Sequence, residues 1–446
     1  MPDGSQDAMG FGAVTKEGVI EEPWWWRDHR PMSKGDPLPE RTDVLVIGSG
    51  YAGLNCALEL ARAGTDVTVV DAWAIGGGAS SRAAGFLSGR TGVSKQINLV
   101  KMVGAARADA ILDEADEAYE NLKDFVAREQ IDCDLEFKGR FVGAHTPRAY
   151  DRIAKKTAEY NRDGQDNQVM VPRADQGAYV ASDLYHGGMF MRTAASINPE
   201  KYHAGLVARC RDAGVRMVPM TRVTGWDRDG VGFRVQTSEG DVSALQVAQG
   251  TGGYTDNASP WHARRVIPIS STVIATEDLG VETVSRLLPQ GCPVIDTKRV
   301  LDFARPTPDG RSILYGGRAS FLPVSLETKL SILRTKLAAT FPELTDVPLT
   351  HVWDGQMAFS FDFLPKLGAH DGAHYAMACN GGSGIVMMSW LGKRMASNIL
   401  GTANRSSAFE GLEFKSHAFY AGKPWFLPIV GTYYRLRDWM EVKTGT

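Results

Sequence analysis

The chain has 446 residues, of which 43% are hydrophobic and 23% charged, and its 49 basic and 52 acidic side chains give a formal net charge of −3. A single hydrophobic core stops growing at roughly 250–300 residues, so we expect at least two domains. The nearly balanced charge provides no broad positive field for a phosphate backbone, which excludes nucleic acid as an expected partner.

Targeting and cysteine patterns predict a cytoplasmic protein. Residues 1–12 lack a basic stretch followed by an apolar run, and no window approaches the roughly 18 uncharged apolar residues of a spanning helix. We therefore expect neither secretion nor a membrane span. The five cysteines are far apart and form no Cys-x-x-Cys pair, so we expect reduced thiols and no metal site.

Residues 1–40 precede the first regular element. Several prolines surround the triplet Trp24-Trp25-Trp26, which predicts an extended arm rather than a helix or strand. Three adjacent tryptophans need burial. We expect the arm to pack on its own domain or on a neighbouring subunit, so oligomerisation through it stays open; contact with a substrate is a second alternative.

The next segment has the pattern of a βαβ unit. Asp43–Ile47 and Thr65–Val70 are short apolar runs, and Leu54–Ala63 between them has the spacing of a buried helix. The loop after the first run, residues 48–53, matches Gly-x-Gly-x-x-Gly, and Asp71 closes the second run. The whole context predicts a dinucleotide site of Rossmann type.

Each glycine of this loop has a mechanical role. Gly48 permits the tight turn, Gly50 lets the backbone approach a pyrophosphate, and Gly53 lets the helix pack against the sheet. The amino end of the helix favours phosphate groups, and Asp71 can accept hydrogen bonds from ribose hydroxyls. The unit fits NAD and FAD equally.

Later segments alternate between helices and strands. Apolar positions between Ile97 and Val126 recur at helical spacing, which predicts one long amphipathic helix. Further elements are predicted at Phe233–Thr237, Ala244–Val247 and Ser271–Ala275 as strands and at Lys329–Ala339 as a helix.

Three more glycine clusters follow the first. They are Gly76–Phe86, Gly250–Tyr254 and Cys379–Val386. Any one of them alone is typical of a turn. Together with the first loop they predict a ligand long enough to touch four distant segments.

The ordered set of motifs resembles the D-amino-acid oxidase superfamily of FAD enzymes, and within it the branch of gamma-glutamylputrescine oxidoreductase and the glycine and sarcosine oxidases. The resemblance extends from about Trp24 to Trp439. The residues that carry it are Gly48–Gly53, Gly78–Arg82, Ile131–Asp134, Asn198, Pro199, Ile274–Glu277, Gly310, Arg311, Gly316–Arg318, Trp353, Gly355, Asp362, Pro365 and Gly382–Gly384.

The resemblance implies an α/β fold: a Rossmann-type FAD-binding domain with an α+β substrate domain built on an antiparallel sheet. It implies a discontinuous FAD-binding domain formed by residues 41–92, 197–260 and 349–405. The substrate domain is expected from residues 93–196 and 261–348, and residues 406–446 form a C-terminal tail.

FAD is the cofactor that the resemblance implies. Val223 is expected to meet the adenine through its backbone, and the loop before Ile385 to lie beside the flavin pyrimidine ring. The full expected set is Gly48, Gly50, Tyr51, Ala52, Gly53, Asp71, Ala72, Ser80, Ser81, Arg82, Ala84, Gly85, Phe86, Val223, Gly252, Gly355, Gly382, Ser383, Gly384 and Ile385.

Expected substrate-site residues are Phe86 and Phe303 as aromatic walls, with His186 and His262 as candidate proton acceptors. Met357 stands where amino-acid oxidases of the family carry a carboxylate-binding arginine and where sarcosine oxidases carry a flavin-linking cysteine. We therefore expect noncovalent FAD and no α-carboxylate anchor at this position. Any such anchor would have to be another arginine, with Arg305 and Arg318 as candidates.

The resemblance predicts oxidation of a C–N bond in a primary or secondary amine that does not rely on an α-carboxylate. Leu314 corresponds to the lysine that activates oxygen in sarcosine oxidase, so both O2 and another electron acceptor stay open. Two alternatives remain: a flavin dehydrogenase of a 2-hydroxy acid or amino acid, and an FAD-binding subunit of a larger complex.

Overall fold

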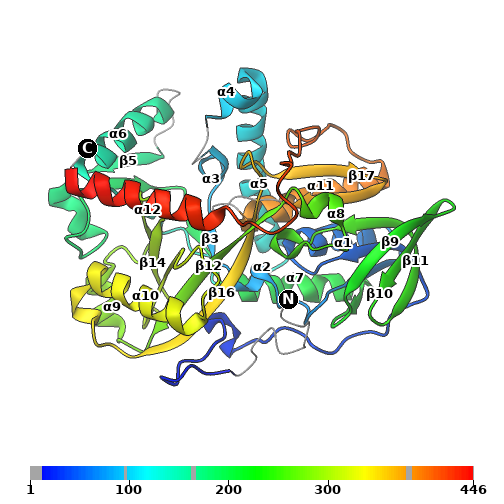
Figure 1. Cartoon of the computed structure of the whole chain (residues 1–446), viewed down its shortest axis with the longest axis horizontal. Coiled ribbons are helices and arrows are strands. Elements are labelled where there is room, and N and C mark those ends of the chain that lie inside the picture. Colours follow the sequence, from blue (N-terminus) through cyan, green and yellow to red (C-terminus); the bar gives the residue numbers. More distant parts are fainter. Residues whose placement is uncertain (1–12, 95–97, 162–166, 378–383, 445–446) are drawn as a thin grey trace.

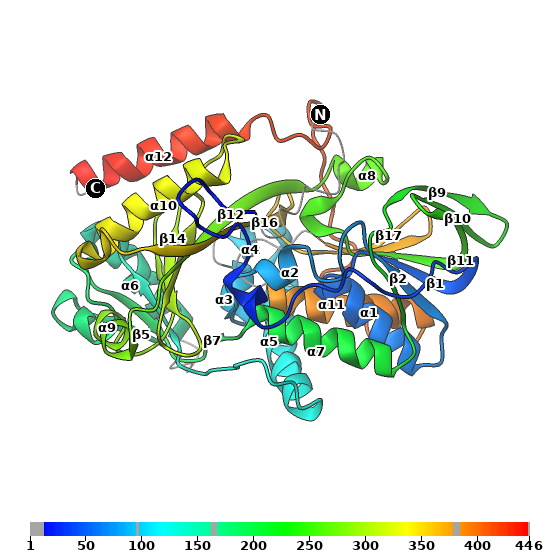
Figure 2. The ribbon, with the colours of Figure 1, turned by 90° about the horizontal axis from the view of Figure 1, so that it is seen from below.

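The computed structural model describes residues 13–94, 98–161, 167–377 and 384–444 (Figure 1). Within this part of the chain, two eight-stranded sheets and a two-stranded pair organise the fold. The two large sheets lie next to each other, each with helices on an outer face (Figure 2). The mixed α/β class predicted from the sequence is confirmed.

The first sheet is the nucleotide-type sheet, with strand order β17-β18-β11-β1-β2-β8 and a hairpin of β9 and β10 beside β11. The strands from β18 to β8 in this order run parallel. Their bounds are β1 (Arg41–Ile47), β2 (Val67–Val70), β8 (Arg216–Val218), β9 (Val223–Asp229), β10 (Gly232–Thr237), β11 (Gly240–Gln249), β17 (Lys366–His370) and β18 (Ala373–Met377).

Four helices cover one face of the first sheet, and the β9–β10 hairpin covers the other. The helices are α1 (Tyr51–Arg62), α5 (Ala105–Arg128), α7 (Pro199–Asp212) and α11 (Gly384–Leu400). A side chain at Gly392 of α11 would lie 2.3 Å from the carbonyl oxygen of Ala52. This glycine therefore allows α11 to pack tightly on α1, and the tight contact fixes the first turn of α1.

The second sheet has the order β16-β12-β15-β14-β13-β4-β6-β5 and is antiparallel except between β13 and β4, which run parallel. Side chains alternate across it: Phe303 faces the inside of the molecule, and Ala304 faces the outer helices. The bounds are β4 (Arg140–Gly143), β5 (Gln168–Val171), β6 (Gly188–Met191), β12 (Ile267–Thr276), β13 (Val294–Asp296), β14 (Asp302–Pro306), β15 (Ile313–Gly317) and β16 (Leu349–Phe359).

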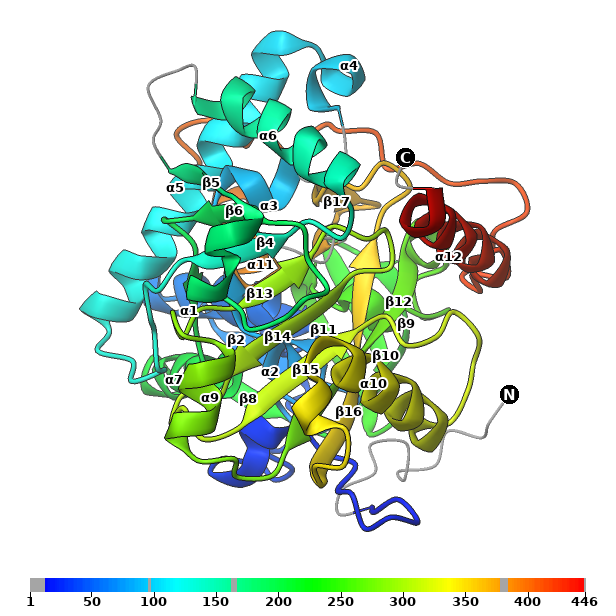
Figure 3. The ribbon, with the colours of Figure 1, turned by 90° about the vertical axis from the view of Figure 1, so that its left-hand side faces the viewer.

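The remaining elements surround this second sheet or connect the two sheets. Helix α6 packs against β5 and β6 at one end of the sheet (Figure 3). The bounds are α2 (Ala79–Arg82), β3 (Phe86–Leu87), α3 (Arg90–Ser94), α4 (Leu99–Val103), α6 (Pro147–Asn161), β7 (Ala195–Ser196), α8 (Pro260–Ala263), α9 (Val281–Leu287), α10 (Leu326–Thr340) and α12 (Leu427–Thr444).

Two segments lie in a different layer from the one expected. Strand β16 pairs with β12 in the second sheet, although residues 349–405 were expected in the nucleotide domain. Helix α5 packs against α11 in the core under the first sheet, although residues 93–196 were expected in the substrate domain. Apolar periodicity predicts that a segment is buried, but not which sheet buries it.

The long helix expected from Ile97 to Val126 is interrupted. Gly104 adopts φ +81°, a left-handed conformation, and separates α4 from α5. The other predicted segments match β10, β11, β12 and α10 to within a few residues at their ends. No described helix meets the length and apolarity needed to cross a bilayer.

The N-terminal arm packs on its own chain. Trp24–Arg27 forms a short 3-10 helix rather than an extended segment, and Trp24, Trp25 and Trp26 are 5%, 2% and 1% exposed. Further upstream, the backbone N–H of Val352 in β16 donates to the carbonyl oxygen of Ile20. The tryptophans are thus buried between the arm and the second sheet without a second subunit.

Candidate functional site

A cavity of about 1570 Å³ lies between the carboxyl ends of β1, β2 and β11 and the inner face of the second sheet. Pockets for one small molecule measure roughly 300–1000 Å³. The cavity therefore has room for a large ligand and a second, smaller one. Ligands of open α/β sheets bind at this edge, outside the carboxyl ends of parallel strands.

The glycine loop forms the floor at the end of β1. Gly48 has φ +97°, and a side chain at Gly53 would lie 1.9 Å from the carbonyl oxygen of Gly48. Gly50 is the residue before α1, and Gly48, Gly50, Tyr51 and Ala52 line the cavity. Gly53 does not line it, which agrees with its packing role. The amino end of α1 is thus exposed to the cavity.

Asp71 lies at the carboxyl end of β2 and holds the glycine loop in place. Its Oδ2 accepts from the Ser49 N–H (2.8 Å) and hydroxyl (2.6 Å), and its Oδ1 accepts from the Trp73 N–H (3.0 Å). A carboxylate offers about four acceptor positions, so capacity remains for a ribose hydroxyl. Burial raises the pKa of Asp71, and the hydrogen bonds from Ser49 and Trp73 oppose that rise.

Residues 79–86 form the second wall, and Ser80 joins it to the glycine loop. The Ser80 hydroxyl oxygen accepts from the Tyr51 N–H (3.1 Å), and the Tyr51 hydroxyl donates to the Ser80 carbonyl oxygen (2.9 Å). The Arg82 guanidinium donates from Nε to the Gly77 carbonyl oxygen (2.9 Å). Burial lowers the pKa of Arg82. Both Ser80 and Arg82 line the cavity.

Three indole N–H groups hold the back of this wall. Trp26 donates to the Ser81 hydroxyl (3.0 Å), Trp25 to the Ala83 carbonyl oxygen (3.0 Å) and Trp353 to the Arg82 carbonyl oxygen (2.9 Å). Ser81 is 1% exposed and does not line the cavity, so it positions the wall from behind. Through Trp25 and Trp26, the N-terminal arm therefore holds residues 81–83 of the cavity wall in place.

Phe86 and Phe303, the two expected aromatic walls, lie side by side. Their rings lie 5.1 Å apart at 84°, an edge-to-face pair, and both line the cavity. Gly85 has φ +79°, and a side chain there would lie 2.1 Å from the Ile197 carbonyl oxygen. This close approach holds the strand that carries Phe86.

Met357 lies in β16 opposite Ile269 of β12, and both line the cavity. The other expected cofactor residues that line it are Ala72, Ala84, Gly85, Val223, Gly252, Gly355, Gly384 and Ile385. Gly382 and Ser383, as well as Cys379, lie outside the described residues.

His262, a candidate proton acceptor, lies away from the cavity. It is 1% exposed, does not line the cavity, and packs among aromatic rings, 4.7 Å from that of Tyr375. Its Nδ1 lies 2.6 Å from the Ser259 hydroxyl, and burial lowers the pKa of His262 to about 3. His186 does not line the cavity either. A lone histidine in a sequence does not reveal whether its ring faces a ligand or a core.

Arg318 and Arg140 line the cavity, and neither forms an ion pair with a described residue. Arg318, at the end of β15, was a candidate anchor; Arg140, in β4, was missed. An arginine within the apolar strand Arg140–Gly143 was the available signal. Arg305, the other candidate, does not line the cavity: its Nη1 donates to the carbonyl oxygens of Ala84 (2.9 Å) and Ile197 (3.0 Å).

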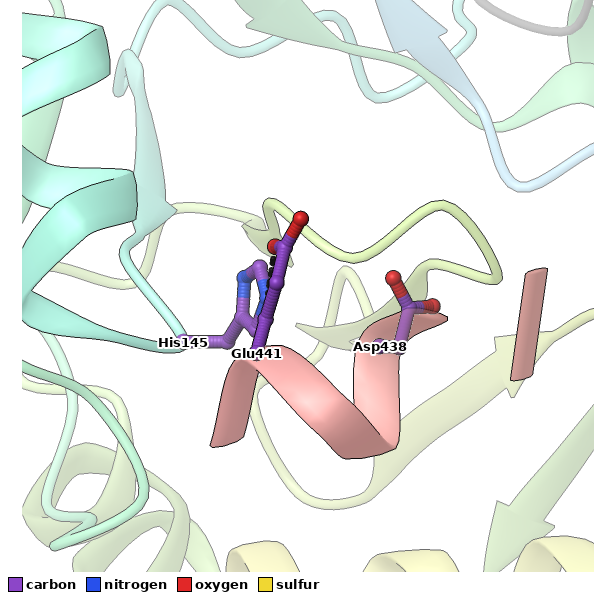
Figure 4. A group of neighbouring side chains, drawn as sticks. All are labelled: His145, Asp438 and Glu441. Carbon is purple, nitrogen blue, oxygen red and sulfur yellow. Dashed lines mark ion pairs between the residues drawn. The ribbon is translucent and has the colours of Figure 1, made fainter. Parts of the chain in front are cut away.

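Three side chains of the types that can bind a metal ion lie outside the cavity, where α12 meets the second sheet. They are His145, Asp438 and Glu441 (Figure 4). Arg299 already pairs with both carboxylates, at 2.9 Å to Asp438 and 2.5 Å to Glu441. The Asp438 carboxylate also accepts from the backbone N–H groups of Arg299 and Val300. The cluster is thus an ion-pair network that holds α12 against the second sheet.

Comparisons with known proteins agree with this geometry. Residues 43–398 match the family described as FAD dependent oxidoreductase (DAO). The chain is 30% identical over 405 residues to gamma-glutamylputrescine oxidoreductase of Escherichia coli, covering 90% of this chain and 93% of the relative. It is 29% identical over 390 residues to probable oxidoreductase OrdL of Haemophilus influenzae, covering 86% and 88%.

Glycine oxidase from Geobacillus kaustophilus has a similar fold, with a TM-score of 0.69 and 20% identity over 85% of this chain and 99% of that one. Three features fit FAD: the glycines at positions 48, 50 and 53 of the loop, the remaining acceptor capacity of Asp71, and the size of the cavity. The family match covers well over half of the chain. The protein belongs to the FAD dependent oxidoreductase (DAO) family, and FAD is its cofactor.

Proposed function

We propose that this protein oxidises a C–N bond of a primary or secondary amine. The amine loses a hydride from its α-carbon and a proton from nitrogen, and the imine so formed is hydrolysed by water to an aldehyde or keto product. Bound FAD supplies the acceptor for the hydride and its electron pair. The names of two relatives, gamma-glutamylputrescine oxidoreductase and glycine oxidase, support amine chemistry.

The observation that carries the substrate proposal is the position of Met357. Its side chain is in the cavity wall, beside Ile269 and within the apolar cluster of Phe359 and Phe361. A thioether cannot pair with a carboxylate, whereas a bidentate arginine can. We therefore propose an amine that does not depend on an α-carboxylate held at this position.

We propose that the protein positions and desolvates the amine, and that no side chain takes up its proton. The Phe86–Phe303 pair and the methionines Met189 and Met191 form an apolar wall that favours the uncharged amine. His262, the candidate base, faces another cluster. Holding the α-carbon in line with the hydride acceptor is therefore the main catalytic contribution that we assign to these side chains.

We propose O2 as the final electron acceptor, reduced to H2O2 by the two electrons taken from the amine. Leu314 is 2% exposed inside the cluster that contains Phe303, and it does not line the cavity, so this position places no cation there. The acceptor is therefore measured directly: H2O2 yield in air is compared with reduction of a soluble quinone under argon. If turnover requires the quinone, the final electron acceptor is not O2 but a quinone or another carrier.

An anaerobic reduction screen tests the substrate class. The purified flavoprotein is mixed with a panel of amines and, separately, with 2-hydroxy acids of matched chain length, and bleaching of the flavin band is followed. We expect bleaching by amines only. Bleaching by hydroxy acids alone would establish the dehydrogenase alternative, and flavin that no compound bleaches would favour a structural FAD-binding subunit.

A further inference from the structure

Arg140 is a buried cation without a counter-ion. It is 7% exposed, and within the described part of the chain no carboxylate forms an ion pair with it. Its Nε has no hydrogen-bond partner, and its Nη2 donates a long hydrogen bond to the thioether sulfur of Met191, at 3.9 Å. Burial lowers the pKa of Arg140 to about 10, so the guanidinium is still charged at neutral pH.

The strand alternation directs this cation into the cavity. Arg140 and Val142 line the cavity, whereas Phe141 between them packs on the opposite face of β4. The neighbouring positions of β6 are Met191 and Met189, which are apolar. A buried guanidinium in such surroundings is costly unless an anion pairs with it.

Two other cations that line this cavity are neutralised by the protein. Lys298 pairs with Asp296 (2.9 Å) and Asp302 (3.4 Å), and Arg299 pairs with the carboxylates of α12. At these two positions the chain's own acids compensate the cation, whereas Arg318 and Arg140 form no ion pair among the described residues. Arg140 is therefore available to a ligand, and its Cζ lies 6.0 Å from the centroid of the Phe86 ring.

The sheet order separates this cation from Met357. Arg140 is on β4 and Met357 on β16, five strand positions apart, with β14 and Phe303 between them. At roughly 4.8 Å per strand, the path along the sheet is about 24 Å. Phe303 therefore stands between Arg140 and Met357 in the order of the sheet, and an anion at Arg140 is held by a different strand from the one that carries Met357.

We infer that Arg140 binds an acidic group of the substrate, and that this group is several bonds away from the oxidised C–N bond. The substrate class is an ω-aminocarboxylate or a related amine with a remote carboxylate. A guanidinium presents parallel N–H groups that match a carboxylate in a bidentate pair. The inference rests on the proposed function, because it needs the amine end to react beside Phe86.

Matched substrate pairs test it. Pentylamine is compared with 5-aminopentanoate and hexylamine with 6-aminohexanoate, so each pair differs in the acid group. We expect the wild type to prefer the acid member in kcat/KM by roughly 30-fold or more, and Arg140→Met to lose that preference. Arg140→Lys keeps the positive charge but lacks the paired N–H donors, so it should retain part of the preference for the acid member.

A binding measurement provides a readout independent of turnover. Pentanoate and hexanoate, which cannot be oxidised at a C–N bond, are titrated against the flavin absorbance band of the wild type. Arg140→Met should raise the apparent Kd of both acids by roughly 30-fold or more. Added guanidinium ion should restore carboxylate binding and turnover to Arg140→Ala, because it replaces the missing group.

Two controls separate an anchor from a general defect. Arg234→Met makes the same change on the exposed β9–β10 hairpin and should leave both readouts unchanged. Arg318→Met makes the same change just after β15. We expect it to reduce the preference for substrates with a remote acid less than Arg140→Met does. Normal FAD content in each variant shows that the fold is intact.

The outcomes distinguish this inference from the proposed function. If amines bleach the flavin but the acid group has no effect, or Arg140→Met matches the wild type, the Arg140 inference is overturned and amine oxidation stands. If preference is confined to glycine and sarcosine, the anion lies beside the reacting carbon and the remote acid is wrong. If no amine bleaches the flavin, the proposed function itself fails, while carboxylate titration still reports on Arg140.

Discussion

The indole Nε1 of Trp26 donates to the hydroxyl oxygen of Ser81 across 3.0 Å, and that hydroxyl donates in turn to the carbonyl oxygen of Gly76 at 2.5 Å. The arm is thereby joined to both ends of the segment from Gly76 to Ser81. The Arg82 guanidinium also lies over the Trp26 ring, 4.4 Å from its centroid. A part of the chain that precedes the first strand thus helps to set the shape of the cofactor wall.

Trp26→Phe should weaken FAD binding while leaving the ring buried. The variant loses one hydrogen bond, worth about 1 kcal/mol, which corresponds to roughly fivefold in the Kd for FAD. Titration of apoprotein with FAD, followed by fluorescence quenching, measures it. Trp425→Phe removes an indole hydrogen bond at an exposed site far along the chain and is the matched control. Equal Kd values for the two variants would contradict this role of the arm.

FAD should be held without a covalent bond, and Gly50 should be needed to hold it. Acid denaturation of the wild type should release the yellow colour into the filtrate. Gly50 has φ −76°, which any residue tolerates, so Gly50→Val should fold but place a side chain against the pyrophosphate and abolish FAD retention. Gly177→Val, at a position with open space around it, should keep its FAD. Flavin left on the precipitate, or a yellow Gly50→Val protein, would contradict the assignment.

Met357→Arg should shift specificity toward α-amino acids. Desolvating a carboxylate without an anchor costs several kcal/mol, on the order of hundredfold in kcat/KM. We expect the wild type to discriminate against glycine and sarcosine, and the variant to accept them better while losing turnover of other amines. Steady-state kcat/KM with both substrate sets measures this. A wild type that already prefers sarcosine would make Arg318, which lines the same cavity, the α-carboxylate anchor.

His262→Asn should affect stability rather than catalysis. Because burial lowers the pKa of His262 to about 3, its ring stays neutral throughout the assay range, and the pH profile of kcat should not change. The variant should lose about 1–2 kcal/mol of unfolding free energy through lost packing. The depressed pKa contributes stability above pH 6.5, the unfolded value, that is lost as pH falls below it; the variant should lack that dependence. A shifted kcat profile would restore His262 as a proton acceptor.

Asp438→Asn should loosen the C-terminal helix. The substitution removes the charge that Arg299 contacts and weakens acceptance from two backbone N–H groups. We expect faster proteolysis near the start of α12 and a loss of about 1–3 kcal/mol in unfolding free energy. Asp346→Asn, on an exposed turn, is the control. Unchanged proteolysis would mean that the exposed and partly buried apolar residues of α12, rather than the ion pairs, hold the helix.

The sequence by itself determined the local elements and the dinucleotide loop. A βαβ unit has short-range order: Gly48, Gly53 and Asp71 lie within one supersecondary unit, and their spacing follows from its geometry. Phe86 and Phe303 were each expected at the substrate site only because the resemblance to a family supplied the fold. Strand periodicity similarly predicted β10, β11 and β12 within a few residues.

Only the tertiary structure decided which segments meet across long stretches of chain. It placed β16 beside β12, the three tryptophans behind Ser81 and Ala83, and His262 in an aromatic core away from the cavity. It also brought Arg140 to the cavity wall without an acidic partner. These facts depend on pairings between strands and on the absence of a neighbouring charge, and neither leaves a periodic signal in a single sequence.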